Sequence, residues 1–178
     1  MGTIIAAEYV TLDGVIEAPA WTGPYFNDDL AKLQSDLLFA SDALLLGRVT
    51  YEGFAAAWPR MEESEGEFAV RMNQLPKHVA SRTLSTMEWN ATPLGPDVVE
   101  AVTTLKQADR TLLIFGSSGL VNTLLRHDLI DRYRLMIFPV VVGHGKRLFD
   151  GGPDTKTLRP VATTVTTTGV LVADYEPA

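Results

Sequence analysis

The chain of 178 residues predicts a single α/β domain whose mixed sheet is mostly parallel, flanked by helices, and antiparallel at its C-terminal end. Three short apolar runs, at 43–46, 78–80 and 112–115, each stop at a glycine or serine before a helix-like pattern or a turn. Runs this short are typical of buried strands in a parallel sheet. A threonine-rich stretch at 161–175 contains one central turn signal and predicts a terminal antiparallel hairpin.

The hydrophobic pattern gives the elements in chain order. A first strand at 3–10 is followed by a loop at 11–25 that is rich in glycine and proline. Apolar residues at helical spacing predict a helix over 26–41, with Asn27 or Asp28 as its cap. The later elements are expected to be a strand at 43–46, a short helix at 49–57, an exposed acidic loop at 60–66, a helix at 67–75, strands at 77–81 and 86–89, a helix at 97–108, a strand at 111–115, a helix at 118–127, a β run at 132–142, and strands at 161–167 and 170–175 around Thr168-Gly169.

Composition and charge limit the classes of function. No repeat or linker divides residues 1–178, so we expect one domain. The net charge of −7 argues against a nucleic-acid partner, which requires a basic face. No apolar run reaches the roughly 18 residues that a membrane span requires, so we expect no membrane partner. The absence of cysteine excludes disulfides, zinc-thiolate sites and thiol nucleophiles, and we expect no metal. Because the first eight residues lack the basic region of a signal peptide, we expect a cytoplasmic protein.

Two of the expected strands end in residues suited to binding a phosphate. Ligands of open α/β sheets bind at the carboxyl ends of the strands. Gly47 and Arg48 follow one strand, and Thr50 either donates to the same phosphate or satisfies the first helical turn. Ser81 and Arg82 follow the next strand and suit the 2′-phosphate that distinguishes NADPH from NADH. The alternative for each arginine is a solvated surface cation.

The strongest local signal follows the strand at 111–115. Gly116, Ser117, Ser118 and Gly119 form a turn of small residues, and a helix begins near Leu120. Backbone N–H groups at a helix start make a favourable site for a pyrophosphate. The spacing differs from the G-x-G-x-x-G fingerprint, and the alternative interpretation is a tight turn without a ligand.

Four segments, in this order and spacing, resemble the dihydrofolate reductase superfamily, and within it the branch of the riboflavin-biosynthesis reductase (RibD C-terminal) domain. They are Thr11-Leu12-Asp13-Gly14, Gly47-Arg48-Val49-Thr50-Tyr51-Glu52, Ser81-Arg82, and Phe115-Gly116-Ser117-Ser118-Gly119-Leu120 with Pro139-Val140-Val141-Val142-Gly143 after it. The resemblance covers nearly the whole chain. It implies a single dihydrofolate reductase-like domain over 1–178 and an NADPH-dependent reductase whose cofactor lies across the strand ends. The implied activity resembles that of 5-amino-6-(5-phosphoribosylamino)uracil reductase, with hydride transfer to a ribosylamino-pyrimidine or another heterocycle.

The same resemblance points to acidic residues for the substrate. In dihydrofolate reductases an acidic residue in the first helix holds the pteridine ring, and Asp29 or Asp28 matches that position. Asp13, in the loop before that helix, is a third candidate for a catalytic role. A pair of acids in a first helical turn also favours the helix dipole with no ligand at all.

Other candidates for the substrate side lie in two loops. The loop at 11–25 is expected to close over the nicotinamide, and Trp21 is either its aromatic cover or a packing anchor. Lys146 and Arg147 follow Gly145 and either face a substrate phosphate or remain solvated. The substrate is expected to be a small molecule.

Three alternatives remain after the sequence is considered. The first is the riboflavin-type reductase, the second is a dihydrofolate- or pteridine-type reductase with another substrate, and the third is a nucleotide-binding module without turnover. The related reductases are commonly dimers, and the β surface at 135–142 and 161–175 exceeds what the expected helices can cover. We therefore expect a homodimer built on the C-terminal strands.

Overall fold

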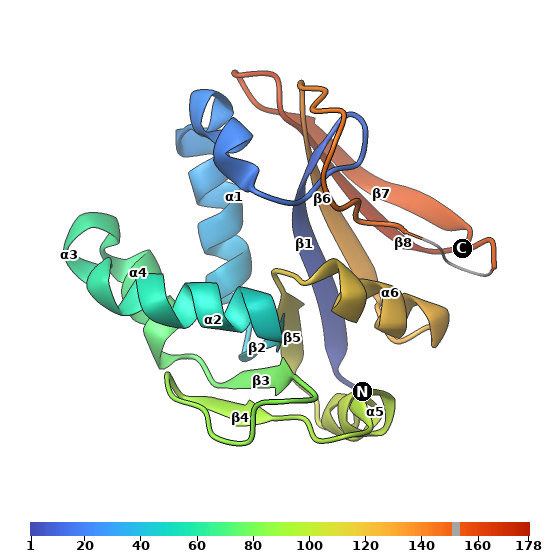
Figure 1. The fold of residues 1–178 in the computed structure, drawn as a ribbon. Coiled ribbons are helices and arrows are strands. Elements are labelled where there is room, and N and C mark those ends of the chain that lie inside the picture. Colours follow the sequence, from blue (N-terminus) through green and yellow to red (C-terminus); the bar gives the residue numbers. More distant parts are fainter. Residues whose placement is uncertain (151–153) are drawn as a thin grey trace.

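The computed structural model describes residues 1–150 and 154–178, and a mixed β-sheet runs through its centre (Figure 1). The strands are β1 (Thr3–Thr11), β2 (Ala43–Gly47), β3 (Lys77–Ala80), β4 (Ala91–Pro93), β5 (Thr111–Ile114), β6 (Arg132–Phe138), β7 (Leu158–Val165) and β8 (Leu171–Pro177). They lie in the order β4-β3-β2-β5-β1-β6-β8-β7. Pairs from β4 to β6 are parallel, and β6-β8 and β8-β7 are antiparallel, so the predicted mixed sheet is confirmed.

Helices lie between the strands as the pattern predicted. The α-helices are α1 (Asp28–Phe39), α2 (Arg48–Ala57), α3 (Glu62–Glu65), α4 (Glu67–Gln74), α5 (Val98–Gln107) and α6 (Ser118–Arg126), with 3₁₀ helices η1 (Pro19–Tyr25) and η2 (Trp58–Arg60). Asn27 caps α1, because its side chain accepts a hydrogen bond from the Leu30 N–H at 3.2 Å. Over the described ranges, no helix combines the length and the apolar character needed to cross a bilayer.

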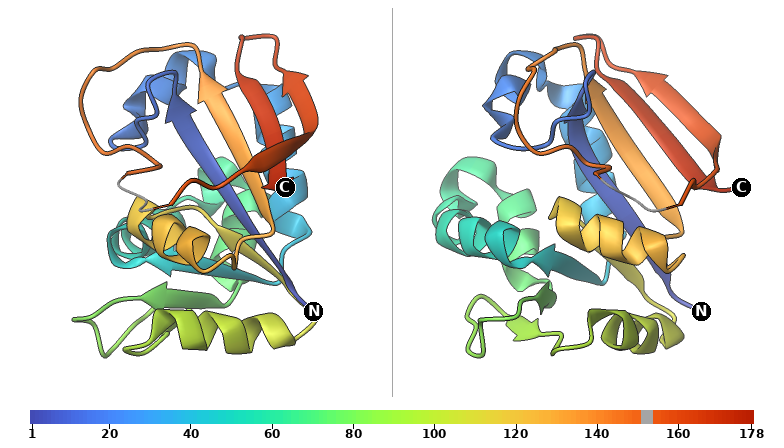
Figure 2. Two further views of the ribbon diagram at one scale, coloured as in Figure 1. Left: turned by 90° about the vertical axis from the view of Figure 1, so that its right-hand side faces the viewer. Right: turned by 45° about the vertical axis from the view of Figure 1, so that its right-hand side comes forward.

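Helices lie on both faces of the sheet (Figures 1 and 2), and an apolar layer covers each face. Successive residues of a strand point to opposite faces. In β1, Ile5 and Ala7 pack with residues of α1, α2 and α4, whereas Ile4, Ala6 and Val10 pack with residues of α5 and α6. Both faces of the central strands are therefore buried, which explains why their sequences are continuous apolar runs.

The expected strand at 86–89 is wrong, and the strand in this region is β4, a few residues later. The Tyr51 hydroxyl holds the earlier segment by bonding both the N–H (2.9 Å) and the carbonyl (3.3 Å) of Glu88. Trp89 and Asn90 then have positive φ angles of 59° and 54°, so the chain turns before it can pair. The Trp89 ring also covers the Nζ of the buried Lys77, at 3.8 Å from the ring centre.

Three other segments differ from the expected pattern. The loop at 11–25 contains η1, and the acidic loop at 60–66 contains the one-turn helix α3. The β run expected to reach residue 142 stops at Phe138, because Pro139 has no N–H to continue the ladder. Beyond Phe138, the N–H groups of Val142 and Gly143 donate hydrogen bonds to the Asp13 carboxylate.

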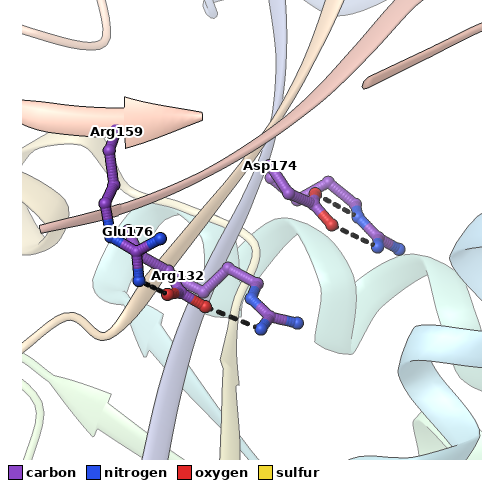
Figure 3. Close-up of polar contacts among 5 residues, drawn as sticks. Arg132, Arg159, Asp174 and Glu176 are labelled. Carbon is purple, nitrogen blue, oxygen red and sulfur yellow. Dashed lines mark hydrogen bonds and ion pairs between the residues drawn. The ribbon is translucent and has the colours of Figure 1, made fainter. Parts of the chain in front are cut away.

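Ion pairs attach the C-terminal hairpin to β6 (Figure 3). Asp174 accepts two hydrogen bonds of 2.8 Å from the Arg134 guanidinium, and this carboxylate is only 6% exposed. Glu176 lies between Arg132 and Arg159, with both contacts at 2.8 Å. A bidentate pair has a fixed geometry, so these contacts help to set the register of β6, β8 and β7.

Candidate functional site

The three strand ends that the sequence marked lie next to one another. Strands β3, β2 and β5 are neighbours and run parallel. Gly47 is opposite Ala80, and Leu45 is opposite Ile114. Arg48 and Ser81 therefore directly follow two paired residues, and the turn after Ile114 lies on the other side of β2. The parallel sheet thus brings together three strand ends, at Gly47, Ala80 and Ile114, that are far apart along the chain.

Gly47 and Ser117 interlock at this edge. A Cβ added to Gly47 would lie 2.2 Å from the Ser117 Oγ and 2.7 Å from the Ser117 Cβ, which is too close for any side chain. The Gly47 N–H donates to the Gly116 carbonyl at 3.1 Å. The end of β2 and the turn after β5 can pack this closely only because residue 47 is glycine.

Gly116 and Thr50 make the second close contact. Gly116 has a φ of +118°, a conformation that residues with a Cβ rarely adopt, and a Cβ here would lie 2.9 Å from the Thr50 Oγ1. The first turn of α2, which carries Thr50, therefore packs directly on the turn that leads into α6. The peptide bond between Gly116 and Ser117 is cis.

The start of α6 presents backbone donors at the same edge. The Ser117 side chain caps the helix by accepting from the Leu120 N–H at 3.3 Å. The N–H groups of Ser118 and Gly119 belong to the first turn and have no partner within the helix. A Cβ at Gly119 would meet only the Ser117 Oγ, at 3.7 Å, so there is space in front of this turn. Free donors at a helix N-terminus with space beside them suit the phosphates of a dinucleotide.

The cations near the edge are exposed. Arg48 pairs with Glu52 one turn later in α2, at 2.8 Å. The Ser81 Oγ accepts from the N–H groups of Thr83 (3.2 Å) and Leu84 (3.0 Å), so it shapes a turn. Arg82 lies on the exposed side of this turn. A surface ion pair such as Arg48–Glu52 is weak, so its arginine is available to a stronger anionic partner.

The two acids at the start of α1 differ in their surroundings. Asp29 accepts hydrogen bonds from both the N–H and the hydroxyl of Thr167, each at 3.1 Å, and these bonds lower the pKa of its carboxyl. Asp28 is exposed. Asp29 therefore connects α1 to the turn of the C-terminal hairpin and stays ionised at neutral pH.

Asp13 also holds a loop in place. The Thr11 hydroxyl and then the Gly143 N–H, at 2.8 Å, are the main donors that lower the pKa of its carboxyl to about 2. Its backbone carbonyl accepts from the Arg147 Nε at 3.0 Å. The structure therefore brings Asp13 and Arg147 together. No local sequence pattern could predict this contact, because the two residues are far apart along the chain.

Lys146 and Trp21 lie near the same pair of loops. The Lys146 backbone N–H donates to a Glu17 carboxylate oxygen at 3.1 Å, while the Trp21 indole donates to the Glu17 carbonyl at 3.4 Å. The Trp21 ring packs edge-on against Phe138, with 5.4 Å between the ring centres. Trp21 is thus anchored by packing at the end of β6, and it remains partly exposed.

Apart from Trp21, sequence reasoning missed the aromatic side chains that gather on the α1 and α2 face of the sheet. They form two groups of edge-on contacts: Phe54, Trp58, Trp89 and Phe115 in one, and Tyr9, Trp21, Tyr25 and Phe138 in the other. Their spacing along the chain is irregular, so only the fold collects them.

A buried carboxyl group was also missed. Glu8, in β1, is 5% exposed, and its Oε1 has no hydrogen-bond partner within residues 1–150 and 154–178. Burial raises the pKa of Glu8 to about 8. The sequence did carry a signal, because an acidic residue interrupts the apolar run of a central strand.

Comparison with known proteins gives the family. The model of the RibD C-terminal domain family matches residues 2–172. The chain belongs to this family. It is also 30% identical over 169 residues to the uncharacterized protein YyaP of Bacillus subtilis (strain 168), covering 93% of this chain and 90% of the relative. The RibD C-terminal family is a riboflavin-pathway-like family of reductases, so the resemblance found in the sequence is confirmed.

Solved structures agree on the fold. A putative riboflavin biosynthesis protein from Shewanella sp. PV-4 superposes with a TM-score of 0.81 at 20% identity, over 100% of this chain and 99% of that chain. Dihydrofolate reductase from Enterococcus faecalis, complexed with NADP(H), superposes with a TM-score of 0.66 at 18% identity, over 98% of this chain and 94% of that one. The RibD C-terminal domain described here therefore has the predicted dihydrofolate reductase-like fold.

The contact between Gly47 and Ser117 generates a stability prediction. Gly47→Ala should destabilise the protein by about 1–3 kcal/mol, because its Cβ would force the Ser117 side chain off the α6 cap. Chemical denaturation measures this change. Gly53→Ala in α2 is the control, since nothing lies within 4 Å of its Cβ, and it should be neutral or stabilising. In the double variant Gly47→Ala with Ser117→Gly, the loss of unfolding free energy should be smaller than the sum of the losses in the two single variants. Strictly additive losses would contradict the proposed clash.

Proposed function

We propose that the protein is an NADPH-dependent reductase that transfers a hydride to a heterocyclic substrate, with a ribosylamino-pyrimidine of the riboflavin pathway as the expected substrate class. The observation that carries the proposal is the interlocked edge formed by Gly47, Thr50, Gly116 and Ser117. Glycine is required at residues 47 and 116, because a Cβ there would clash with Ser117 or Thr50, and the first turn of α6 offers its N–H groups beside them.

The residues at this edge fit the cofactor. The N–H groups of Ser118 and Gly119 would bind the pyrophosphate, as donors at a helix N-terminus do. Arg48, Ser81 and Arg82 would bind the 2′-phosphate, since guanidinium groups make strong charge-assisted hydrogen bonds to phosphate. NADPH supplies the hydride, and the task of the protein is to orient the nicotinamide and the substrate.

The ionised acids have a defined role in this proposal. Because hydrogen bonds lower the pKa of both Asp29 and Asp13, each carboxylate accepts hydrogen bonds at neutral pH and is a poor proton donor. Asp29, with Asp28 beside it, would therefore bind N–H groups of the substrate ring rather than protonate it. Asp13 would act mainly through the loop at 142–143 that it holds.

Two further groups complete the substrate side. Trp21, held against Phe138, would cover the nicotinamide or the substrate ring. Lys146 and Arg147 would bind a substrate phosphate. The Lys146 N–H donates to the Glu17 carboxylate and the Arg147 guanidinium donates to the Asp13 carbonyl, and these contacts hold the loop that carries both residues. A pteridine-type substrate is the second candidate, favoured by the superposition on a dihydrofolate reductase.

Cofactor choice gives the first test. The protein should bind NADPH at least ten-fold more tightly than NADH, because each charge-assisted bond to the 2′-phosphate contributes about 1.5–3 kcal/mol. Arg82→Ala should remove most of this preference, whereas Arg126→Ala, at the far end of α6, should leave it intact. Dissociation constants for both cofactors measure the effect. Equal affinity for NADPH and NADH would exclude the proposed 2′-phosphate site.

Turnover gives the second test. NADPH oxidation should be measured across a panel of ribosylamino-pyrimidine phosphates and dihydropteridines. Asp29→Asn should lower kcat/KM for any active substrate by roughly ten-fold or more, with little change in NADPH affinity. Lys146→Ala and Arg147→Ala should lower kcat/KM only if the substrate carries a phosphate. Activity on pteridines alone, with no effect of either cation, would select the second candidate, and NADPH binding without any turnover would select a binding module.

We also propose that two copies associate through the C-terminal strands. β7 is an edge strand, and its residues Val161 and Val165 are 39% and 64% exposed. Phe149, in the loop before β7, is 46% exposed. An exposed apolar edge of this kind is normally covered. Sedimentation at micromolar concentration should give twice the monomer mass of 19.4 kDa, and Val165→Lys should give a monomer. A monomer for the unchanged protein would contradict this proposal without affecting the reductase proposal.

A further inference from the structure

Glu8 stands apart from the other acids because it is buried and one of its carboxyl oxygens has no hydrogen-bond partner among the described residues. It lies in the middle of β1, a central strand, where it is 5% exposed and its Oε1 makes no hydrogen bond. A buried and unpaired carboxylate is costly, so the group stays protonated unless something compensates its charge. None of the contacts described above for the cofactor or the substrate uses Glu8.

The position of Glu8 connects it to the phosphate edge. Residues alternate along β1, and Ala6 and Val10, on either side of Glu8, pack in the layer formed by α5 and α6. Ala6 is opposite Ile114, the last residue of β5, and the turn at Gly116 follows two residues later. Glu8 therefore lies on the α6 side of the sheet, one strand away from the turn that begins α6.

The described side chains that pack on this face from α6, from β6 and from Leu148 are uncharged. From α6, the buried residues are Ser118, Leu120, Val121, Asn122 and Leu124. From β6, the residue opposite is Leu135, and the same face carries Tyr133 and Ile137. Leu148 packs on this layer from the loop after β6, and the Asn122 amide binds its carbonyl at 2.7 Å. Tyr133 is the titratable group among these, and burial raises its pKa, so it is neutral too.

We propose that Glu8 is a positioning residue whose protonation state controls how tightly the α6 edge binds an anionic dinucleotide phosphate. The inference rests on the proposed function, because it needs a phosphate at that edge. With the proton bound, Glu8 is neutral and the edge has only donors and cations. When the proton leaves, a carboxylate lies in the apolar layer under α6 and repels the incoming phosphates. Ionisation of Glu8 therefore weakens phosphate binding, and a bound phosphate makes the ionisation of Glu8 less favourable by the same free energy.

The expected size follows from simple electrostatics. One strand spacing and a helix radius set a separation of about 10 Å. Two like charges at that distance, in surroundings typical of a protein, change an equilibrium constant roughly ten-fold. Burial raises the pKa of Glu8 from 4.5 to about 8, so the transition lies above neutral pH. The affinity for NADPH should therefore stay nearly constant up to about pH 7.5 and fall as the pH rises from 8 to 9.5.

The experiment measures the dissociation constant of NADPH at pH 6.5 and pH 9.5. We expect the ratio of these constants to be about ten-fold larger for the unchanged protein than for Glu8→Gln, which keeps the shape and cannot ionise. Glu63→Gln, an exposed acid in α3, is the control and should behave like the unchanged protein. Equal ratios for the unchanged protein and Glu8→Gln would overturn the inference and leave the proposed function standing. Failure to bind NADPH at any pH would overturn both.

A second measurement needs no variant, in case Glu8→Gln does not fold. Carbon-13 NMR of protein labelled in glutamate follows the Glu8 carboxyl directly. Its titration midpoint should lie well above that of the exposed glutamates and should rise by about one pH unit when NADPH is bound, the counterpart of a ten-fold change in affinity. A midpoint that does not move on binding would overturn the inference. A purely structural role for Glu8 would change the folding stability but not this shift.

Discussion

The close contact between the end of β2 and the turn after β5 is the constraint on which the candidate site depends. Three chemical features converge there: Gly47 has no side chain, Gly116 has a positive φ, and Ser117 both fills the space beside Gly47 and caps α6. Any side chain at residue 47 would separate the two segments. The start of α6 then would not lie beside the start of α2, and donors from two helices would no longer share one edge.

The rest of the fold supports this edge from below. The strands β2, β5 and β1 carry apolar side chains on both faces and are buried between two helical layers. Burial of this kind supplies most of the free energy of folding, and it leaves the polar functional groups to the loops at the strand ends. Glu8 is an exception, because it places an ionisable group inside one of these layers. Exceptions of this type are often connected with function.

The C-terminal half contributes in a different way. β8 and β7 are antiparallel, and ion pairs join β8 to β6 on one side and to β7 on the other, with Asp174 and Arg134 largely buried. The turn between them reaches back to α1, where Thr167 binds Asp29. The loop after β6 reaches back to Asp13 in the same manner. Two carboxylates that look like free acids in the sequence are therefore also structural acceptors, and their low pKa values follow from these contacts.

The sequence by itself determined the class of fold, the strands at 43–46 and 112–115 and the family, and it narrowed the cap of α1 to Asn27 or Asp28, because these depend on local periodicity, on capping chemistry and on short motifs. It could not place β4, since the turn at Trp89 and Asn90 depends on the Tyr51 hydroxyl from a distant helix. It also could not show that Gly47 contacts Ser117, that Asp13 holds residues 142–143, or that Glu8 is buried without a partner. Only the tertiary structure decided these points, because each of them depends on atoms brought together from segments far apart in the chain.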